Sequence, residues 1–197
     1  MQEAQIINSI AIYIQTDFMR TPTFLFFIML SFCASAQKFI SAESKIHFFS
    51  DAPLEDIEAT TTEARSVFDS NSGEMVFSVP VESFQFEKKL MQEHFNENYL
   101  ESEKYPKSSF KAAITDWNGQ TGEQEVEVSG DFTLHGVTKN VSIPGQINFT
   151  DDKVVVDAVF TVLLKDYKIK IPKAVFMNIA EEIEVTVHFE YDPYEKG

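Results

Sequence analysis

Alternation of apolar and polar residues is the clearest pattern in this chain, and it predicts β-strands. In residues 181–191 (EEIEVTVHFEY), every second residue from Ile183 to Tyr191 is apolar, and the residues between them are polar. Residues 154–165 (VVVDAVFTVLLK) show the same period. A strand of this kind has one dry face and one wet face, as in antiparallel sheets that cover a core.

Further segments alternate less cleanly: 44–50, 107–117, 123–135 and 139–149, with 73–86 apolar on both faces. Glycine, asparagine and aspartate separate several of them, at Asn71-Ser72-Gly73, Asn118-Gly119 and Asp151-Asp152-Lys153. The pattern predicts about eight short antiparallel strands, which is typical of a β-sandwich or a closed barrel. A closed barrel of that size either fills with side chains or holds one small ligand.

Two stretches interrupt the strand pattern. Residues 87–102 carry Leu90, Met91, Phe95 and Tyr99 at helical spacing, which predicts one amphipathic helix. Residues 166–182 combine a proline with an apolar cluster, and we expect a loop with a short helical turn there.

The first 36 residues have a different organisation. Between Met19 and Ala36 the chain has one arginine, an apolar run from Phe24 to Phe32, and Ala-Ser-Ala before Gln37. This order predicts a secretory signal peptide over residues 19–36. The apolar run is too short for a stable membrane anchor, so we expect it to be removed.

Residues 1–18 contain Glu3 and Asp17 but no basic residue, which is the wrong charge for the start of a leader. We therefore expect translation to start at Met19. Residues 1–18 are then an upstream extension that is not part of the protein, and 37–197 form the mature barrel domain. Cys33 is the only cysteine and follows the bulky Phe32, which is a poor context for lipidation. The mature chain then contains no disulfide.

Charge and composition exclude some partners and leave others open. The chain has 31 acidic and 16 basic residues, a net charge of −15, which argues against nucleic acid and anionic membranes as electrostatic partners. The oligomeric state stays open, a dimer included.

Catalytic groupings are missing from the sequence pattern. The four histidines, His47, His94, His135 and His188, fall in four separate predicted elements, and metal sites need converging ligands. No nucleophile-elbow, P-loop or dinucleotide motif is present. The sequence predicts no enzyme, no metal and no cofactor.

Phenylalanine is the more informative residue, with 19 in the chain. Apolar residues at periodic positions line either a pocket or an ordinary filled core, and composition alone leaves both open. The pocket hypothesis assigns lining roles to Phe77, Val79, Phe84, Phe86, Met91, Phe95, Phe110, Phe160 and Met177, with Tyr99 or His94 meeting a polar head group.

One motif favours the pocket. Residues 129–143 (SGDFTLHGVTKNVSI) resemble the G-x-L-T-L-H-G-V-T-K signature of the YceI-like family of secreted polyisoprenoid-binding proteins, and residues 79–114 resemble the segment upstream of it. The resemblance extends from about Phe39 to Tyr191. It departs from the family at Lys89–Asn98, where many members have an Arg-Asp-x-His-Leu run.

The resemblance implies an eight-stranded, lipocalin-like antiparallel barrel with an apolar pocket for a long-chain isoprenoid or another lipid, in a periplasmic or secreted protein. We therefore expect a non-catalytic carrier or sequestering protein. Two alternatives stay open: a filled barrel that binds an envelope partner, and an enzyme acting on an isoprenoid or fatty amide. Within the motif, we expect His135-Gly136 to form a tight turn with an architectural role, and Thr138 to bond the local backbone.

Overall fold

The computed structural model describes residues 37–172 and 178–194, and most of these residues lie in strands. The strands are β1 (Lys38–Ser50), β2 (Ile57–Thr61), β3 (Arg65–Asp69), β4 (Glu74–Pro80), β5 (Lys107–Ile114), β6 (Gly122–Leu134), β7 (Val137–Phe149), β8 (Val154–Leu163) and β9 (Glu182–Pro193). The short helical segments are η1 (Val81–Ser83), α2 (Lys89–His94), the π-helical turn η2 (Phe95–Tyr99) and η3 (Leu164–Tyr167).

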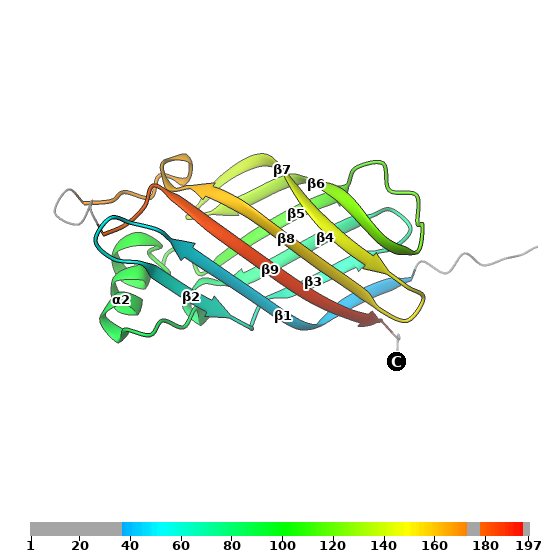
Figure 1. The fold of residues 1–197 in the computed structure, drawn as a ribbon, viewed down its shortest axis with the longest axis horizontal. Coiled ribbons are helices and arrows are strands. Elements are labelled where there is room, and N and C mark those ends of the chain that lie inside the picture. Colours follow the sequence, from blue (N-terminus) through cyan, green and yellow to red (C-terminus); the bar gives the residue numbers. More distant parts are fainter. Residues whose placement is uncertain (1–36, 173–177, 195–197) are drawn as a thin grey trace, which may run out of the picture. The chain divides into compact units, whose positions relative to one another are not determined.

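The strands pair antiparallel with their sequence neighbours, except that β2 and β3 pair with β1 and not with each other, and β1 also pairs with β9, which closes the sheet into a barrel (Figure 1). One edge of β1 is shared by two short strands: Ile46–Ser50 pairs with β2, and Lys38–Ile40 pairs with β3. Because β2 and β3 occupy one position of the ring, the barrel has eight strand positions. The predicted eight-stranded antiparallel barrel is confirmed.

The sequence pattern missed β2 and β3. Each strand is five residues long, and a segment of that length shows too few alternations to be recognised. The pairing partners supply the missing order, because β1 is long enough to hold both strands on one edge.

The predicted helix over 87–102 is shorter in the structure. Its α-helical part is α2, which contains no buried residue, and the chain continues as the π-helical turn η2. Leu100 then follows and is buried among Val81, Val162 and Tyr167. The predicted helical turn in the later loop is η3, which begins two residues earlier than expected.

The two ends of the barrel are built differently. At one end, called the plugged end, lie the β3–β4, β5–β6 and β7–β8 connections. At the other, called the helical end, lie α2, η2, η3 and the β6–β7 turn (Figure 1).

The plugged end is filled by aromatic rings. Phe39, Phe68, Trp117 and Phe149, called the plug, lie with ring centroids between 5.5 and 6.2 Å apart. The Trp117 indole N–H donates to the carbonyl of Ser70 at 2.7 Å, so its polar atom is satisfied. Edge-to-face packing of this kind stabilises the ring cluster beyond the area that it buries.

Candidate functional site

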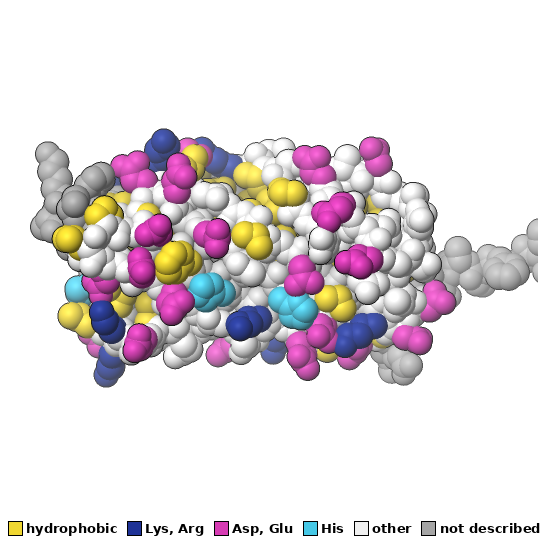
Figure 2. Space-filling view, viewed as in Figure 1, with side chains coloured by type: hydrophobic (Ala, Val, Ile, Leu, Met, Phe, Trp, Pro, Cys, Tyr) yellow, Lys and Arg dark blue, Asp and Glu magenta, His cyan; other side chains and the backbone are white. Residues whose placement is uncertain are grey.

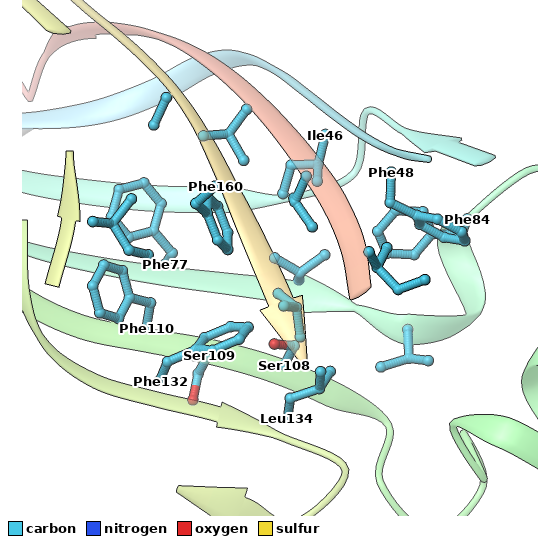
Figure 3. A pocket seen from close by; sticks show the side chains of 18 of the residues that line it. Ile46, Phe48, Phe77, Phe84, Ser108, Ser109, Phe110, Phe132, Leu134 and Phe160 are labelled. Carbon is cyan, nitrogen blue, oxygen red and sulfur yellow. The ribbon is translucent and has the colours of Figure 1, made fainter. Parts of the chain in front are cut away.

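An apolar cavity of about 230 Å³ lies inside the barrel between the plug and the helical end (Figure 3). None of the four plug rings lines it. The cavity is larger than the engineered apolar cavities of about 150 Å³ that stay dry and bind benzene. A hollow of this size and polarity can accept hydrocarbon.

The structure brings nine of the ten residues of the pocket hypothesis together around this cavity. Their side chains come from β4, β5, β8, α2, η2 and the segment between β4 and α2: Phe77, Val79, Phe84, Phe86, Met91, Phe95, Tyr99, Phe110 and Phe160. The tenth, Met177, lies outside the described residues. The same geometry leaves His94 exposed and away from the lining, so of the two expected head-group contacts only Tyr99 reaches the cavity.

Four phenylalanines, called the cap, pack against one another at the helical end: Phe48, Phe84, Phe86 and Phe95. Phe95 stacks on Phe48 with ring centroids 5.5 Å apart and lies 5.0 Å from Phe86. All four rings are half-buried rather than buried. Phe95 is the first residue of the π-helical turn, and π-helical turns are frequent at functional sites.

The floor of the cavity lies next to the plug. Met75 and Phe189 line the cavity and are each 1 % exposed. Phe189 contacts Phe77 on one side and Tyr191 on the other, with centroids 5.1 and 6.0 Å apart. Met75 and Phe189 therefore separate the hollow part of the barrel from the filled part.

Polar groups in the cavity wall are few, and the buried ones are occupied. The Ser50 hydroxyl accepts the backbone N–H of Ala180 at 3.0 Å, and the Ser108 hydroxyl donates to the carbonyl of Thr133 at 2.9 Å. The Asp157 carboxylate faces outward to His188 at 2.7 Å. Burial raises the pKa of the Tyr99 phenol, which stays protonated. The wall therefore offers an apolar ligand a surface with almost no unsatisfied polar atoms.

Sequence reasoning missed a large part of the lining. It named one face of β4 and single residues of β5 and β8, whereas the cavity also takes side chains from β1, β6, β7 and β9: Ile46, Phe48, Val126, Phe132, Leu134, Ile143, Ile183, Val185 and Val187. Alternation could have identified most of them, because Ile46-x-Phe48 and Phe132-x-Leu134 have the period of a strand. Phe132 and Leu134 lie within the recognised motif itself.

The turn inside that motif links three parts of the helical end. His135 and Gly136 have φ of 50° and 71°, so both central residues of the two-residue hairpin adopt the left-handed conformation that type I′ turns require. His135 Nδ1 donates to the carbonyl of Tyr167 at 3.0 Å, and Nε2 lies 2.8 Å from the carboxylate of Glu101. The imidazole thus ties the turn to η3 and to the segment after η2.

Thr138 does not bond the local backbone as expected. Its hydroxyl lies 2.8 Å from the hydroxyl of Thr133, directly across the β6–β7 ladder. The two-residue turn brings these threonines opposite each other, so each finds a side-chain partner before a backbone one.

On the outer surface, His188 bonds Asp157 and also lies 3.4 Å from Glu190, which pairs with Lys153. The Asp157 hydrogen bond raises the pKa of His188, and the Lys153 hydrogen bond lowers the pKa of Glu190. These groups are on the opposite face of the wall from the cavity.

Among the described residues, no three His, Cys, Asp or Glu side chains converge as metal ligands, and no helix is long and apolar enough to span a membrane.

Relatives by sequence cover part of the chain. A UPF0312 protein of Pseudomonas putida strain W619 is 32% identical over 94 residues, which are 45% of this chain and 47% of that protein. A second, from strain GB-1, is 31% identical over the same length. The chain therefore spans about half the length of the curated relatives that it matches.

Solved structures share the fold at low sequence identity. A polyisoprenoid-binding domain from Saccharophagus degradans, described as implicated in plant cell wall breakdown, superposes with a TM-score of 0.69 at 13% identity, covering 81% of this chain and 99% of that one. BcnA from Burkholderia cenocepacia superposes with a TM-score of 0.62 at 18% identity, covering 75% and 95%.

The family model described as the YceI-like domain matches residues 38–191. This range begins at the first residue of β1 and ends within β9, so it contains every strand of the barrel up to Tyr191 and the motif between Leu134 and Lys139. The chain belongs to the YceI-like family.

Proposed function

We propose that this protein binds a long-chain isoprenoid or a similar lipid inside the barrel and carries or sequesters it without chemical change. The observation that supports the proposal most is the apolar cavity, which lies between the cap and the floor. The polyisoprenoid-binding description of one structural neighbour agrees with this ligand class.

The hydrophobic effect suffices for affinity. Each buried CH₂ contributes about 0.8 kcal/mol, so a chain segment of ten carbons gains roughly 8 kcal/mol before the costs of ordering. No charged contact is needed, which suits a wall whose buried serines already have partners.

We further propose that the protein acts in the periplasm or outside the cell, after cleavage near Ala36. The order of charge, apolar run and small residues in 19–36 supports this location. An acidic exterior keeps such a carrier soluble and separate from anionic lipid.

The test is extraction of the purified protein with organic solvent, followed by mass spectrometry, and then uptake of geranylgeraniol by the stripped protein. We expect a long-chain lipid in the extract and binding of the offered isoprenoid. The matched control is Ala158→Phe, which adds a ring to a small residue of the lining and should remove both signals. Absence of lipid from the wild-type extract, together with no uptake, would contradict the proposal.

A further inference from the structure

The barrel wall is incompletely paired between β7 and β8 at the helical end. Pairing joins Gly145–Phe149 to Val154–Ala158 and stops there. Beyond that point β7 pairs only with β6, and the rest of β8 pairs with β9, among the strands described. The cavity has lining residues on both sides of this break, Ile143 on β7 and Phe160 on β8. Val137 of β7 and Leu164 pack in one cluster with Val162 of β8 beside this break, so side chains and not ladder hydrogen bonds close the wall here. This part of the wall is therefore less firmly held than its paired parts.

Lys139 occupies an inward position beside this break. It lies on the face of β7 that carries Val141 and the buried Ile143, and directly opposite Phe132 of β6, which lines the cavity. Among the inward positions of the described strands, it is the only charged residue. A charge on an otherwise apolar face is costly unless it is paired or reaches water, so the partners of this lysine matter.

The ammonium group of Lys139 is only partly committed. It lies 3.0 Å from the carboxylate of Asp166 in η3, on the β8 side of the break, and its side chain is 39% exposed. An ammonium has three N–H donors, and one carboxylate oxygen uses one of them. A second anionic group can therefore bind at the same nitrogen.

Lysines are concentrated in and just after η3 in an otherwise acidic protein. Lys165, Lys168 and Lys170 are exposed there, with the acids Asp166 in η3 and Glu181 and Glu182 beside Leu164 and Leu163. In Figure 2 dark blue side chains lie along the upper edge near η3, with magenta side chains beside them. Lysine side chains close together favour an anionic head group.

We propose that Lys139 binds the head group of an amphiphile whose hydrocarbon chain fills the cavity, and that the head group carries anionic oxygens, as a carboxylate or a phosphate does. The proposal rests on the lipid-binding function proposed above and narrows its ligand class. The chain lies between the floor and the cap, and the head group emerges through the break between β7 and β8 to meet the ammonium group.

An inward lysine at an unpaired strand edge has another role in many sheets, because it prevents edge-to-edge association. That role predicts that removing the charge promotes self-association and leaves ligand preference unchanged. The two roles therefore differ in what the same substitutions do.

The experiment compares ligands of equal chain and different head: geranylgeranyl phosphate with geranylgeraniol, and palmitate with hexadecanol. Each is titrated into stripped wild-type protein, Lys139→Met, Lys139→Gln and Lys139→Arg at low salt. We expect Lys139→Met and Lys139→Gln to weaken the anionic ligands about tenfold and to leave both alcohols within about twofold, because a hydrogen bond to a charged group is lost. Lys139→Arg should retain the preference, and Asp166→Asn should increase it.

The outcomes separate the two proposals. If neither alcohol nor anion binds the wild-type protein, the lipid-binding function fails. If the alcohols bind and the anions gain nothing from Lys139, the head-group proposal fails and lipid binding stands. Self-association of Lys139→Gln with unchanged preference would also overturn it, in favour of edge protection. Phosphate and carboxylate arms that respond differently to the substitutions identify which head group the site prefers.

Discussion

The two ends of this barrel use the same residue type for opposite purposes. At the plugged end, Phe39 and Phe68 are fully buried and contact other rings on several sides. At the helical end, the cap rings Phe84 and Phe95 are half-buried, with one side toward the cavity. The plug stabilises the fold, and the cap and wall leave space for a ligand.

The difference shows that phenylalanine content alone does not indicate a pocket. What distinguishes the ends is the element that carries the rings. Plug rings come from paired strands and from the Trp117 segment, whose indole is anchored to Ser70. Several cap rings come from irregular segments around α2, which has no buried residue. The filled end is thus more tightly packed than the end that carries the cap.

The largest expected effect is on the plug. Phe68→Ala should lower the free energy of unfolding by about 3–5 kcal/mol, because a fully buried ring leaves a cavity among Phe39, Trp117 and Phe149. Urea denaturation measures it. Val67→Ala, the neighbouring residue on the exposed face, is the control and should cost little. Equal losses for both variants would show that the plug is not a packed core.

The next largest effect is expected at His135, because its side chain ties the β6–β7 turn to η3 and to the segment after η2. His135→Asn keeps a residue that tolerates positive φ but loses the bonds to Tyr167 and Glu101, so we expect about 1–3 kcal/mol of destabilisation. Ligand preference should stay unchanged. The control is His47→Asn, which loses a single bond, to Glu58, in a more exposed place. A change in ligand preference without loss of stability would reverse the architectural assignment.

The cavity wall should respond in the opposite way. Phe160→Ala should weaken geranylgeraniol binding about tenfold, since apolar contact with the ligand is lost. It should cost less stability than Phe68→Ala, because this ring already faces the cavity. Isothermal titration calorimetry and urea denaturation measure the pair. Val159→Ala, on the outer face of the same strand, should change neither. A Phe160 variant with full affinity would place the ligand elsewhere.

The smallest effect concerns pH and lies outside both ends. Asp157 and Glu190 raise the pKa of His188 above its unfolded value, so the protonated form stabilises the fold. This contribution is complete below the unfolded pKa of about 6.5 and disappears as pH rises through the folded pKa. Because the group is exposed, we expect less than about 1 kcal/mol.

His188→Gln should therefore lower the melting temperature slightly below about pH 6 and not above about pH 8. Thermal unfolding of both proteins across this range measures it. A deficit that grows as pH rises would contradict the assigned direction of the shift.

Strand alternation predicted most of the barrel but not its break. It placed β6 and β9 within a residue or two of their ends, because both are long and have clear wet faces. It could not find β2 or β3, which are too short to show a period. It could not find the end of the β7–β8 pairing either, because pairing involves two strands and alternation is read from one.

The site was predicted as a set of residues and not as a shape. Phe77 and Phe110 were named as lining. Phe39 and Phe68 are also phenylalanines at inward positions of strands, yet they belong to the plug. Only the three-dimensional arrangement shows that Met75 and Phe189 divide the interior. Lys139 belonged to the recognised motif, but nothing in its sequence position indicated that it lies at an unpaired wall.

The central claim is that the ligand occupies the hollow end and not the filled end, and methyl NMR during titration with geranylgeraniol tests it most directly. Ile143 and Val156 line the cavity, whereas Ile147 and Val154 lie on the same faces of the same strands beyond its lining. We expect the methyl resonances of Ile143 and Val156 to shift until the protein is saturated with geranylgeraniol. The methyl resonances of Ile147 and Val154 should not shift beyond the measurement error. Shifts of equal size at both ends, or none at Ile143 and Val156, would contradict the account.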